Sequence, residues 1–598
     1  MAKSAPSDKD KTSQIRAAKP SRREALIGTM ALGGTSLAAC SAGGSFSNSQ
    51  NSAIIKGFEY GVASGDPTAS SIVIWTRAAP SGPQATSLVR LQWEMARDKD
   101  FEIITKNGEI ETDQSRDWTA KINATGLEAG KTYYYRFKTD QAISPIGRTK
   151  TLPASHVKKL RLAIVSCNSW QHGFFNGLDH IARNPDFDAV IHLGDYIYEY
   201  GIEGYGGEIG KKLGRLHEPP REILSLKDYR QRHAQYKSDP AMQAAHAMHP
   251  MILLWDDHEV ANNSWEGGAQ NHNLSEGDWA ERRRAAMQAY YEWMPVRDPE
   301  PGKAREALYR AYNFGDLATL VTIETRLTAR SEQILIEDYA DSFKTQEDVE
   351  QFRQKVLNNP DRYMLGQAQI DFIEKSLRQS KRQGQPWRLI GNQILMAKVN
   401  IPDLTPFVSE EVIEKIEKDW SGIRPFVETS KYRFPLYLDT WSGYPKARER
   451  LYAACERAGA TDLVVLTGDA HEFWTNDLYS DKGKKIGIEL GTTSLTSATV
   501  EEYLGDGTKD FALLVTKENP EARYYDPLHK GYIDLTLTRK KGVAQYIALS
   551  TVLDTDYKVD MSASFTFKPK GDSVSFTGHK KLGFKEWFLW RQNSAPKT

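Results

Sequence analysis

Short apolar runs that end abruptly in polar residues mark the chain from about residue 153 onward. These runs cover residues 160–165, 189–193, 251–255 and 463–467. Runs of this length are typical of strands buried on both faces, as in parallel sheets. The apolar spacing between them predicts helices over residues 279–293 and 367–380. The pattern indicates an α/β fold whose polar side chains gather at the carboxyl ends of the strands, where open α/β sheets bind ligands.

Residues 54–152 instead show short β-type runs separated by turn signals such as Gly65-Asp66-Pro67. The runs cover residues 71–76, 89–93, 118–122 and 133–137. Short strands at this spacing predict a small all-β sandwich of immunoglobulin or fibronectin type. A chain of 598 residues is also too long for one ordinary core. We therefore expect a β-sandwich over residues 54–152 and an α/β domain with a carboxyl-terminal extension over residues 153–598.

The first 40 residues have the pattern of a targeting segment rather than of a folded element. Ser21-Arg22-Arg23 is a twin-arginine signal, and a short apolar stretch leads from it to Leu37-Ala38-Ala39-Cys40, which resembles a lipobox. Residues 41–53 are rich in Ser, Gly and Asn and predict a flexible linker. We expect export by the twin-arginine translocase to the periplasmic or extracellular face, with membrane attachment through a lipidated Cys40. The alternative is a cleavage site of small residues beside a coincidental Cys40.

Composition narrows the partners and the role of the cysteines. Lys+Arg and Asp+Glu both number 78, so no bulk positive field exists and no nucleic-acid-binding surface is expected. The three cysteines are Cys40, Cys167 and Cys455. With Cys40 at the tether, a disulfide would have to join the other two, and an oxidising compartment does not oblige distant thiols to pair. One of these thiols is therefore available to a metal.

The first candidate metal ligands follow two of the predicted strands. Asp195 leaves its strand through Gly194, and Tyr198 follows three residues later, so a tight turn would aim both oxygens at one cation. A thiolate from Cys167 beside a phenolate points to iron, and His471 would add an imidazole. Taken one at a time, Cys167 is better explained as a small buried hydrophobe and Tyr198 as a packed aromatic, and only their combination with the carboxylates favours a metal. The segment 201–220, with six glycines, is expected to form a loop at the rim of the site.

Carboxylates strengthen the metal hypothesis. Asp195, Asp257 and Asp469 each follow a predicted buried strand, and three carboxylates at one edge of a sheet would repel strongly unless cations held them. In the segment 255–263, Asp257 is a candidate ligand, Asn262 a further one, and His258 a candidate catalytic group. The alternative for this segment is a helix start capped by Asp. The sequence predicts a metal cluster at the carboxyl ends of the strands.

Several ordered motifs together carry a resemblance. They are Gly61-Val62-Ala63-Ser64-Gly65-Asp66-Pro67, Trp75-Thr76-Arg77, Ser166-Cys167, Gly194-Asp195-Tyr196-Ile197-Tyr198-Glu199, Arg232-His233-Ala234-Gln235-Tyr236, the segment 255–263, and Gly468-Asp469-Ala470-His471. With these motifs the chain resembles the PhoD-type alkaline phosphatase family, within the metallophosphoesterase superfamily. The resemblance extends from about residue 57 to beyond residue 530.

The resemblance implies a four-layered metallophosphatase-like sandwich preceded by the small all-β domain. It also implies one Fe³⁺ and two Ca²⁺ ions, with other divalent metals as an alternative. Its ligand set falls on Cys167, Asp195, Tyr198, Asp469 and His471, with Asp195 bridging. Asp257-His258 stands where the wider superfamily has an Asn-His pair.

One motif departs from the family pattern. Glu324-Thr325-Arg326 stands where an Asp-Thr-Arg is usual, after Phe314-Gly315-Asp316-Leu317. Arg326 is a candidate phosphate clamp, and a structural salt bridge is an equal alternative for it.

The expected function is that of an exported phosphoesterase that hydrolyses phosphate monoesters, diesters or both and scavenges phosphate. In this hypothesis a metal-bound hydroxide or oxide attacks phosphorus, and the leaving alkoxide departs toward His258. One alternative is a phosphodiesterase or phospholipase D on the same scaffold. Another is a noncatalytic lipoprotein that binds phosphorylated polymers, which the complete set of candidate ligands disfavours.

Overall fold

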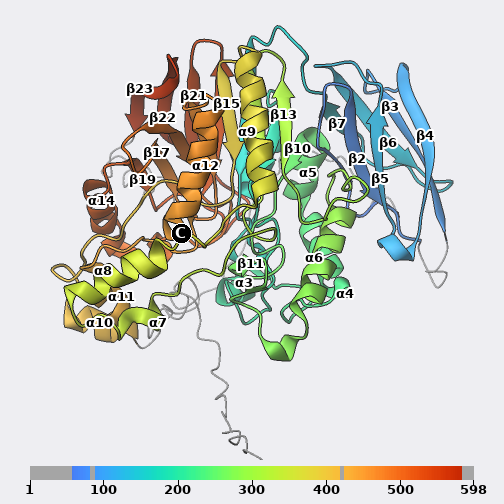
Figure 1. Ribbon diagram of the computed structural model, residues 1–598. Helices are drawn as coiled ribbons and strands as arrows, with labels where there is room; N and C mark the ends of the chain where they lie inside the picture. Colours follow the sequence, from blue (N-terminus) through green and yellow to red (C-terminus); the bar gives the residue numbers. More distant parts are fainter. Residues whose placement is uncertain (1–56, 81–87, 418–422, 582–598) are drawn as a thin grey trace, which may run out of the picture.

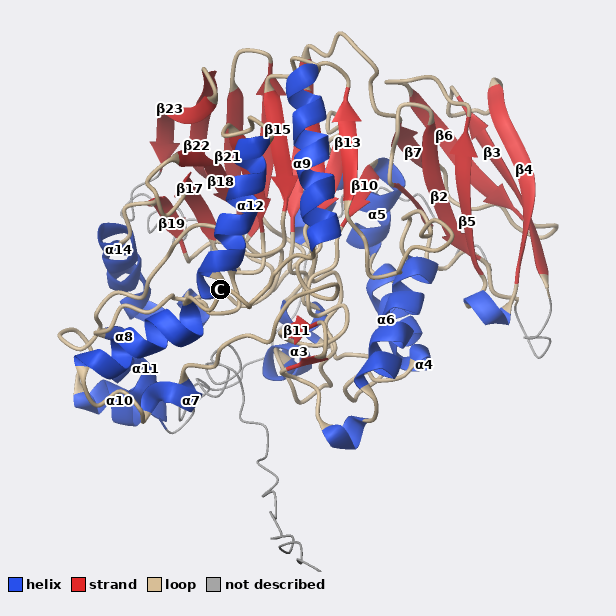
Figure 2. Cartoon of the chain, viewed as in Figure 1, coloured by secondary structure: helices blue, strands red, loops and turns tan. Residues whose placement is uncertain are grey.

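Two β-sheets packed face to face form the middle of the larger domain (Figures 1 and 2). The computed structural model describes residues 57–80, 88–417 and 423–581, so the signal and linker predicted over residues 1–53 lie outside the described part. The first sheet runs β23-β22-β21-β20-β8-β9-β10-β1-β2-β5, and the second runs β13-β14-β15-β16-β18-β17-β19.

The strands of both sheets are mostly short and apolar. The first sheet consists of β1 Val62–Gly65, β2 Ser71–Arg77, β5 Thr119–Thr125, β8 Lys159–Val165, β9 Ala189–His192, β10 Pro250–Leu253, β20 Gly531–Thr538, β21 Gly542–Leu549, β22 Val559–Lys570 and β23 Ser573–Lys581. The second consists of β13 Arg310–Phe314, β14 Ala318–Thr322, β15 Trp387–Gly391, β16 Leu463–Thr467, β17 Phe473–Tyr479, β18 Lys485–Gly491 and β19 Ala522–Asp526. The four runs predicted from the sequence are confirmed as β8, β9, β10 and β16, which are all parallel to their central neighbours.

Helices cover the outer face of each sheet. The first sheet is covered by α2 Asn176–Ala182, α4 Leu226–Lys237, α5 Pro240–Met248 and α6 Trp279–Trp293. The second is covered by α9 Gln367–Arg382, α12 Pro445–Arg457 and α14 Thr508–Glu518. A third apolar core lies between the sheets, where Ile164 and Ile191 meet Leu389 and Leu466. The result is the predicted four-layered α/β/β/α sandwich, and α6 and α9 confirm the two predicted helices.

A further, four-stranded sheet of the amino-terminal region packs against one end of this sandwich. That sheet runs β4-β3-β6-β7, with β3 Val89–Ala96, β4 Ile104–Thr112, β6 Thr132–Lys138 and β7 Gly147–Lys150. It faces β1, β2 and β5 across a small apolar core. However, β1 pairs in parallel with β10, so half of the small sandwich continues the first sheet of the larger domain. The fold therefore changes from all-β to α/β near residue 152, while the hydrogen bonding of the first sheet continues between the two regions.

Asp66, at the end of the motif that contains β1, contacts the α/β domain. Its buried carboxylate accepts from Arg297 N and from Tyr312 Oη, each at 2.9 Å, and ion-pairs with Arg310. These partners belong to the α/β domain, so the motif joins the two regions.

Smaller elements surround the carboxyl ends of the strands, below the sheets in Figures 1 and 2. They are α3 Gly207–Leu213, β11 Ser264–Trp265 and β12 Gly268–Ala269, and, at the lower left of Figure 1, α7 Glu337–Ala340, α8 Gln346–Phe352, α10 Glu410–Glu417 and α11 Ile423–Ser430. The glycine-rich segment expected as a loop thus contains a helix, α3. In the described ranges no helix has the length and apolar character needed to span a bilayer.

Candidate metal centre

The turns that follow β8, β9 and β16 carry the predicted ligands in a strained backbone conformation. Cys167, Asp195, Asp469 and His471 have φ values of 59°, 57°, 61° and 65°. A left-handed conformation costs a non-glycine residue about 1–3 kcal/mol and persists only where the surrounding structure fixes it. Here Cys167 N donates to Gly194 O at 3.1 Å, which ties the first two turns together. Four such residues in one place indicate a functional site.

Two glycines allow these turns to approach one another. A Cβ on Gly194, whose φ is 116°, would lie 2.6 Å from Asp256 N. A Cβ on Gly468 would lie 2.5 Å from Ser166 Oγ. Any side chain at either position would push the ligand turns apart.

Cys167, Asp195, Tyr198 and His471 meet at the first half of the site. Ligand atoms of Cys167, Asp195 and His471 lie within 4.8 Å of one another. Asp195 Oδ2 is 3.3 Å from Cys167 Sγ and 3.2 Å from Tyr198 Oη. Tyr198 Oη is 3.5 Å from His471 Nε2. The structure therefore brings together the four residues that the sequence suggested for iron.

A backbone contact sets the tautomer of His471. Its Nδ1 lies 2.9 Å from Ala498 O and must donate a hydrogen there. Nε2 is then the unprotonated nitrogen of the neutral ring and faces Tyr198. Metal-binding histidines commonly have their second nitrogen held in this way.

Four carboxylates form the second half of the site. Oxygens of Asp195, Asp256, Asp257 and Asp469 lie within 4.8 Å of one another, and all four side chains are buried. Burial raises the pKa of Asp256 well above its usual range, Arg326 opposes this, and the charges of Asp257 and Asp469 raise it further. Sequence reasoning missed Asp256, because two adjacent Asp residues in one strand end do not reveal which of them faces the site.

Arg326 lies among these carboxylates. Its Nε donates to Asp256, and its Nη2 is 3.3 Å from Asp469 Oδ1 and 3.6 Å from Asp257 Oδ1. The ion pairs fit the salt-bridge alternative, and the nearness to the ligands fits the phosphate clamp. Glu324, the residue that departs from the family pattern, accepts from the backbone nitrogens of Arg326, Leu327 and Thr328 and so closes the turn that positions Arg326.

His258 lies beside two carboxylates of the site, those of Asp195 and Asp257. Its Nδ1 lies 2.7 Å from Glu199 Oε2, and a ligand atom of its ring is within 4.8 Å of Asp195 and Asp257. Burial alone would lower the pKa of His258, but Glu199, Asp257 and Asp195 raise it well above the usual value. Before cations bind these carboxylates, their charges favour the protonated ring, with Nδ1 held by Glu199 and Nε2 left to donate. Glu199 was part of a recognised motif, yet its spacing in the sequence gives no sign of this contact.

Glu259 supports the ligand turns from behind. Its carboxylate accepts from the backbone nitrogens of Asp195, Tyr196 and Asp256, at 3.1, 2.7 and 2.8 Å. Burial and the charge of Asp195 raise its pKa to about 8, against these three bonds. Its place three residues after Asp256 in the sequence resembles an ordinary turn, so this role was also missed.

Asn262 lies beside the Glu199–His258 pair. Its backbone nitrogen donates to Glu199 Oε1 and its side-chain nitrogen donates to Gln270 Oε1, both at 2.6 Å. These bonds orient Oδ1 as the remaining side-chain acceptor, and its assignment as a metal ligand stays a prediction.

The residues present fit a group of bound cations. Asp256 Oδ2 is buried and makes no hydrogen bond to the rest of the described chain. Arg326 and His258 both contact this cluster of four carboxylates. The mixed sulfur, oxygen and nitrogen donors on one side suit a transition metal, and the carboxylates on the other side suit a hard cation.

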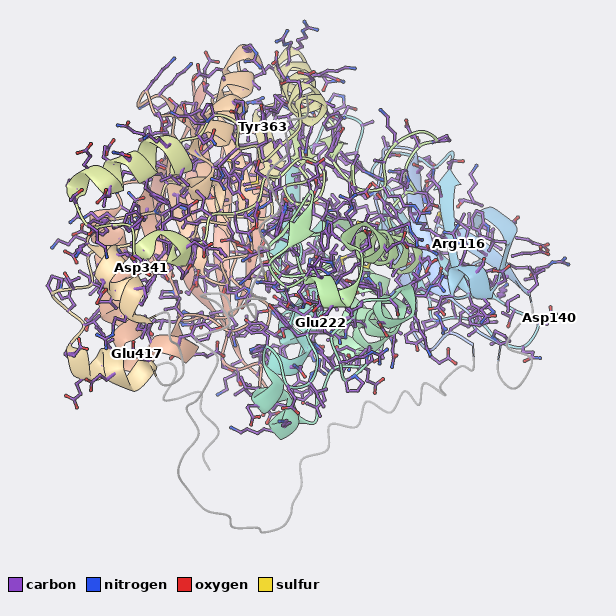
Figure 3. All side chains as sticks on the ribbon, turned by 60° about the horizontal axis from the view of Figure 1, so that its bottom comes forward. Arg116, Asp140, Glu222, Asp341, Tyr363 and Glu417 are labelled. Atoms are coloured by element: carbon purple, nitrogen blue, oxygen red, sulfur yellow. The ribbon has the colours of Figure 1, made fainter. Side chains whose placement is uncertain are left out.

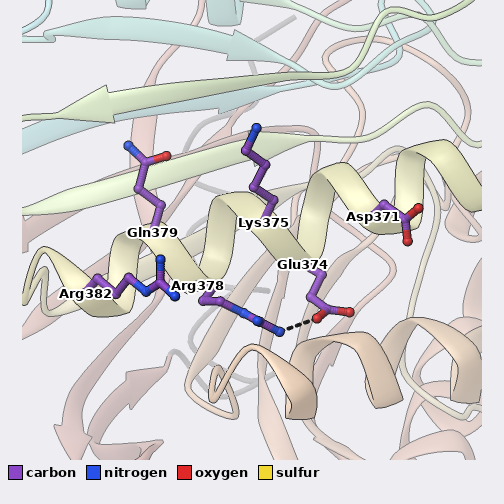
Figure 4. A pocket seen from close by; sticks show the side chains of 6 residues that line it. All are labelled: Asp371, Glu374, Lys375, Arg378, Gln379 and Arg382. Atoms are coloured by element: carbon purple, nitrogen blue, oxygen red, sulfur yellow. Dashed lines mark hydrogen bonds and ion pairs between the residues drawn. The ribbon is translucent and has the colours of Figure 1, made fainter.

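Hollows elsewhere on the surface contain none of the candidate ligands. One, of about 480 Å³, runs along the exposed face of α9 and is lined by charged side chains such as Glu374 and Arg378, which pair with each other (Figure 4). Figure 3 labels Glu222, whose carboxylate accepts from Arg282 at 2.7 Å.

Comparison with known proteins identifies the family. A family model described as PhoD-like phosphatase matches residues 162–546, and one described as PhoD-like phosphatase, N-terminal domain, matches residues 44–153. The chain belongs to the PhoD-like phosphatase family. It is 34% identical over 525 residues to alkaline phosphatase D of Bacillus subtilis (strain 168), covering 86% of this chain and 81% of that protein. It also superposes on a solved structure of PhoD with a TM-score of 0.70 and 31% identity, over 90% of this chain and 97% of the other.

Family membership confirms the resemblance and the fold predicted from the sequence. As a member of the PhoD-like family the chain is a phosphatase. The clustered acidic and histidine side chains, together with this relative, indicate that it depends on metal.

Proposed function

We propose that this phosphatase is an exported phosphoesterase that uses iron and calcium to hydrolyse phosphate monoesters, diesters or both. The observation that carries the proposal is the meeting of Cys167, Asp195 and His471 with the Asp256, Asp257 and Asp469 carboxylates in one buried cluster. A protein that only binds phosphorylated polymers has no need for a thiol and a phenol at one cation. Phosphate esters are therefore the proposed substrates.

Cys167, Asp195, Tyr198 and His471 would hold the iron, and Asp469 and Asp195 would be shared with the calcium side. Asp257 and Asn262 are the proposed calcium ligands, and Asp256 joins them on the strength of its position. When bound, the metals neutralise the phosphoryl group and activate water. Burial and the charges of Asp195 and Cys167 raise the pKa of Tyr198 well above its usual value, so its phenol is protonated until a cation replaces the proton.

His258 is the proposed general acid. Glu199 holds Nδ1 and favours the protonated ring, which leaves Nε2–H as the proposed donor to the leaving group. As water adds to phosphorus, the bond from phosphorus to the ester oxygen breaks and Nε2 passes its proton to that oxygen. Arg326 would contribute a fixed positive charge at the carboxylate side of the phosphoryl group.

Export and anchoring are further parts of the proposal. Ser21-Arg22-Arg23 supports passage through the twin-arginine translocase, which carries folded proteins and so suits an enzyme that acquires metal early. Leu37-Ala38-Ala39-Cys40 supports a lipid anchor at the periplasmic or extracellular face. Mass spectrometry of the mature amino terminus tests this anchor. A mature chain that begins with an unmodified residue other than Cys40 would rule the anchor out.

The substrate class is tested with 4-nitrophenyl phosphate and bis(4-nitrophenyl) phosphate. Hydrolysis of either supports a phosphoesterase, and the ratio of the two rates separates a monoesterase from a phosphodiesterase or phospholipase D. A pure, metal-loaded sample that is inert to both esters would favour the noncatalytic lipoprotein.

A further inference from the structure

A chain of tyrosine rings leads from the metal centre toward the surface. Tyr198 is fully buried, and its ring stacks on Tyr205 with centroids 5.7 Å apart. Tyr205 is 5.8 Å from the partly exposed Tyr200, and Tyr503 packs against the same cluster from another part of the chain. None of these three outer tyrosines has a part in the metal centre described above.

Among the outer rings, Tyr200 borders the side of the site where His258 lies. The ring of His258 stacks on Tyr198 with centroids 4.3 Å apart and lies 5.5 Å from Tyr200. A leaving group that takes its proton from His258 must start at this ring and extend toward solvent. Tyr200 is a partly exposed side chain next to this ring.

Hydrogen bonds from neighbouring residues hold Tyr200 and Tyr205 in place. His217 Nδ1 contacts Tyr200 O at 2.8 Å, and Gln171 Nε2 donates to Tyr205 O at 2.9 Å. Tyr205 Oη accepts from Ala498 N at 3.0 Å, next to the residues that position His471. A fixed aromatic surface binds a flat apolar group at little cost in side-chain entropy.

We propose that Tyr200, Tyr205 and Tyr503 form a leaving-group subsite that selects phosphate esters of alcohols with a planar apolar group, aryl esters being the simplest. The proposal rests on the proposed function, since it assumes that the ester oxygen departs on the His258 side. The rings contact the alcohol part of the substrate and not the phosphoryl group, so they change selectivity among esters and not the hydrolysis itself.

The test compares phenyl phosphate with glycerol 1-phosphate. Tyr200→Ala removes the first ring, and we expect kcat/KM for phenyl phosphate to fall about 3- to 10-fold more than kcat/KM for glycerol 1-phosphate. Tyr200→Phe keeps the ring and should leave the ratio unchanged. Tyr503→Ala, on a different segment, should shift the ratio in the same direction as Tyr200→Ala.

A partly exposed tyrosine of the amino-terminal sandwich, Tyr134, gives the matched control, because Tyr134→Ala should not alter the ratio. Calorimetric binding of phenylphosphonate and methylphosphonate, which cannot be hydrolysed, should show the same loss of preference for the phenyl group in Tyr200→Ala and Tyr503→Ala. An unchanged ratio in both alanine variants, with the wild type active on both esters, would overturn the subsite alone. A wild type inert to both esters would instead overturn the proposed function.

Discussion

A cluster of charged side chains lies at each end of the central strands, buried carboxylates at one end and exposed lysines at the other. At the carboxyl ends, Asp195, Asp256, Asp257 and Asp469 are all buried and within a few ångströms of one another. At the amino ends, Lys158, Lys540, Lys541 and Lys568 line an open hollow of about 820 Å³ with their side chains exposed. Carboxylates predominate at one end and lysines at the other, but only the carboxylates are removed from water.

The difference shows which charge cluster needs a counterion. Exposed lysines are solvated and screened by salt, so their mutual repulsion costs little. Buried carboxylates lack that solvation, and like charges at this spacing favour protonation or the binding of cations. The acidic end is therefore a functional site, whereas the basic end is a solvated surface for the purposes of catalysis and folding.

Asp195→Asn is expected to have the largest effect. Asp195 contacts Cys167 and Tyr198 and belongs to every candidate metal group. Losing it should lower kcat for 4-nitrophenyl phosphate by at least about 1,000-fold. The thermal midpoint should change only modestly, because the substitution also removes one of four crowded charges. A variant that keeps wild-type turnover would refute the assignment.

Glu199→Gln comes next, with kcat expected to fall about 10- to 100-fold. The carboxylate that raises the pKa of His258 is lost, so His258 would release its proton at a lower pH. The alkaline limb of the kcat profile should therefore move to lower pH. Glu222→Gln, at a carboxylate that pairs with Arg282, is the matched control and should preserve both kcat and the profile. An unshifted limb in Glu199→Gln would argue against His258 as the acid.

Glu259 should make the metal-depleted protein sensitive to pH. Its pKa is raised in the fold to about 8, so folded Glu259 keeps a proton that the unfolded chain releases near its ordinary value of 4.5. The stability that this provides is fully present below about pH 4.5 and is lost as the pH rises through about 8, by at most about 1.4 kcal/mol per pH unit.

Glu259→Gln should flatten this part of the dependence. It also turns one acceptor into a donor facing backbone N–H groups, which should cost about 1–3 kcal/mol at low pH. Urea unfolding in chelator at several pH values measures both effects. Equal slopes for the wild type and the variant would show that Glu259 does not titrate in this range.

Charge reversal at the basic end should have the smallest effect. Lys540→Glu combined with Lys541→Glu should change kcat less than about 2-fold and the unfolding free energy by no more than about 0.5 kcal/mol for each substitution. A large loss of activity would mean that the two ends are coupled and that their comparison is wrong.

The sequence predicts the fold well where the apolar runs are continuous. The parallel strands β8, β9, β10 and β16 appear where the runs lie, because strands buried on both faces must be apolar throughout. β1 contains Ser64 and Gly65 and so has no continuous apolar run, and its pairing with β10 and the continuity between the two regions were missed.

The metal centre could be predicted as far as each residue follows a strand end. Cys167, Asp195, Asp257, Asp469 and His471 all do so, and parallel strands bring those ends together. Asp256, Glu199 and Glu259 were not assigned, because their roles depend on which way a side chain turns inside a tight loop. Such directions are set by tertiary contacts, for example the close approach of Gly194 to Asp256.

The most direct test of the account is the metal content of the purified protein, measured by elemental mass spectrometry on the wild type and on Asp195→Asn. We predict one iron and two calcium ions per wild-type chain, together with a visible charge-transfer band that Tyr198→Phe shifts, and a loss of iron and of the band in Asp195→Asn. A fully active wild-type sample without any bound metal would contradict the claim that the buried acidic end of the strands is a metal centre.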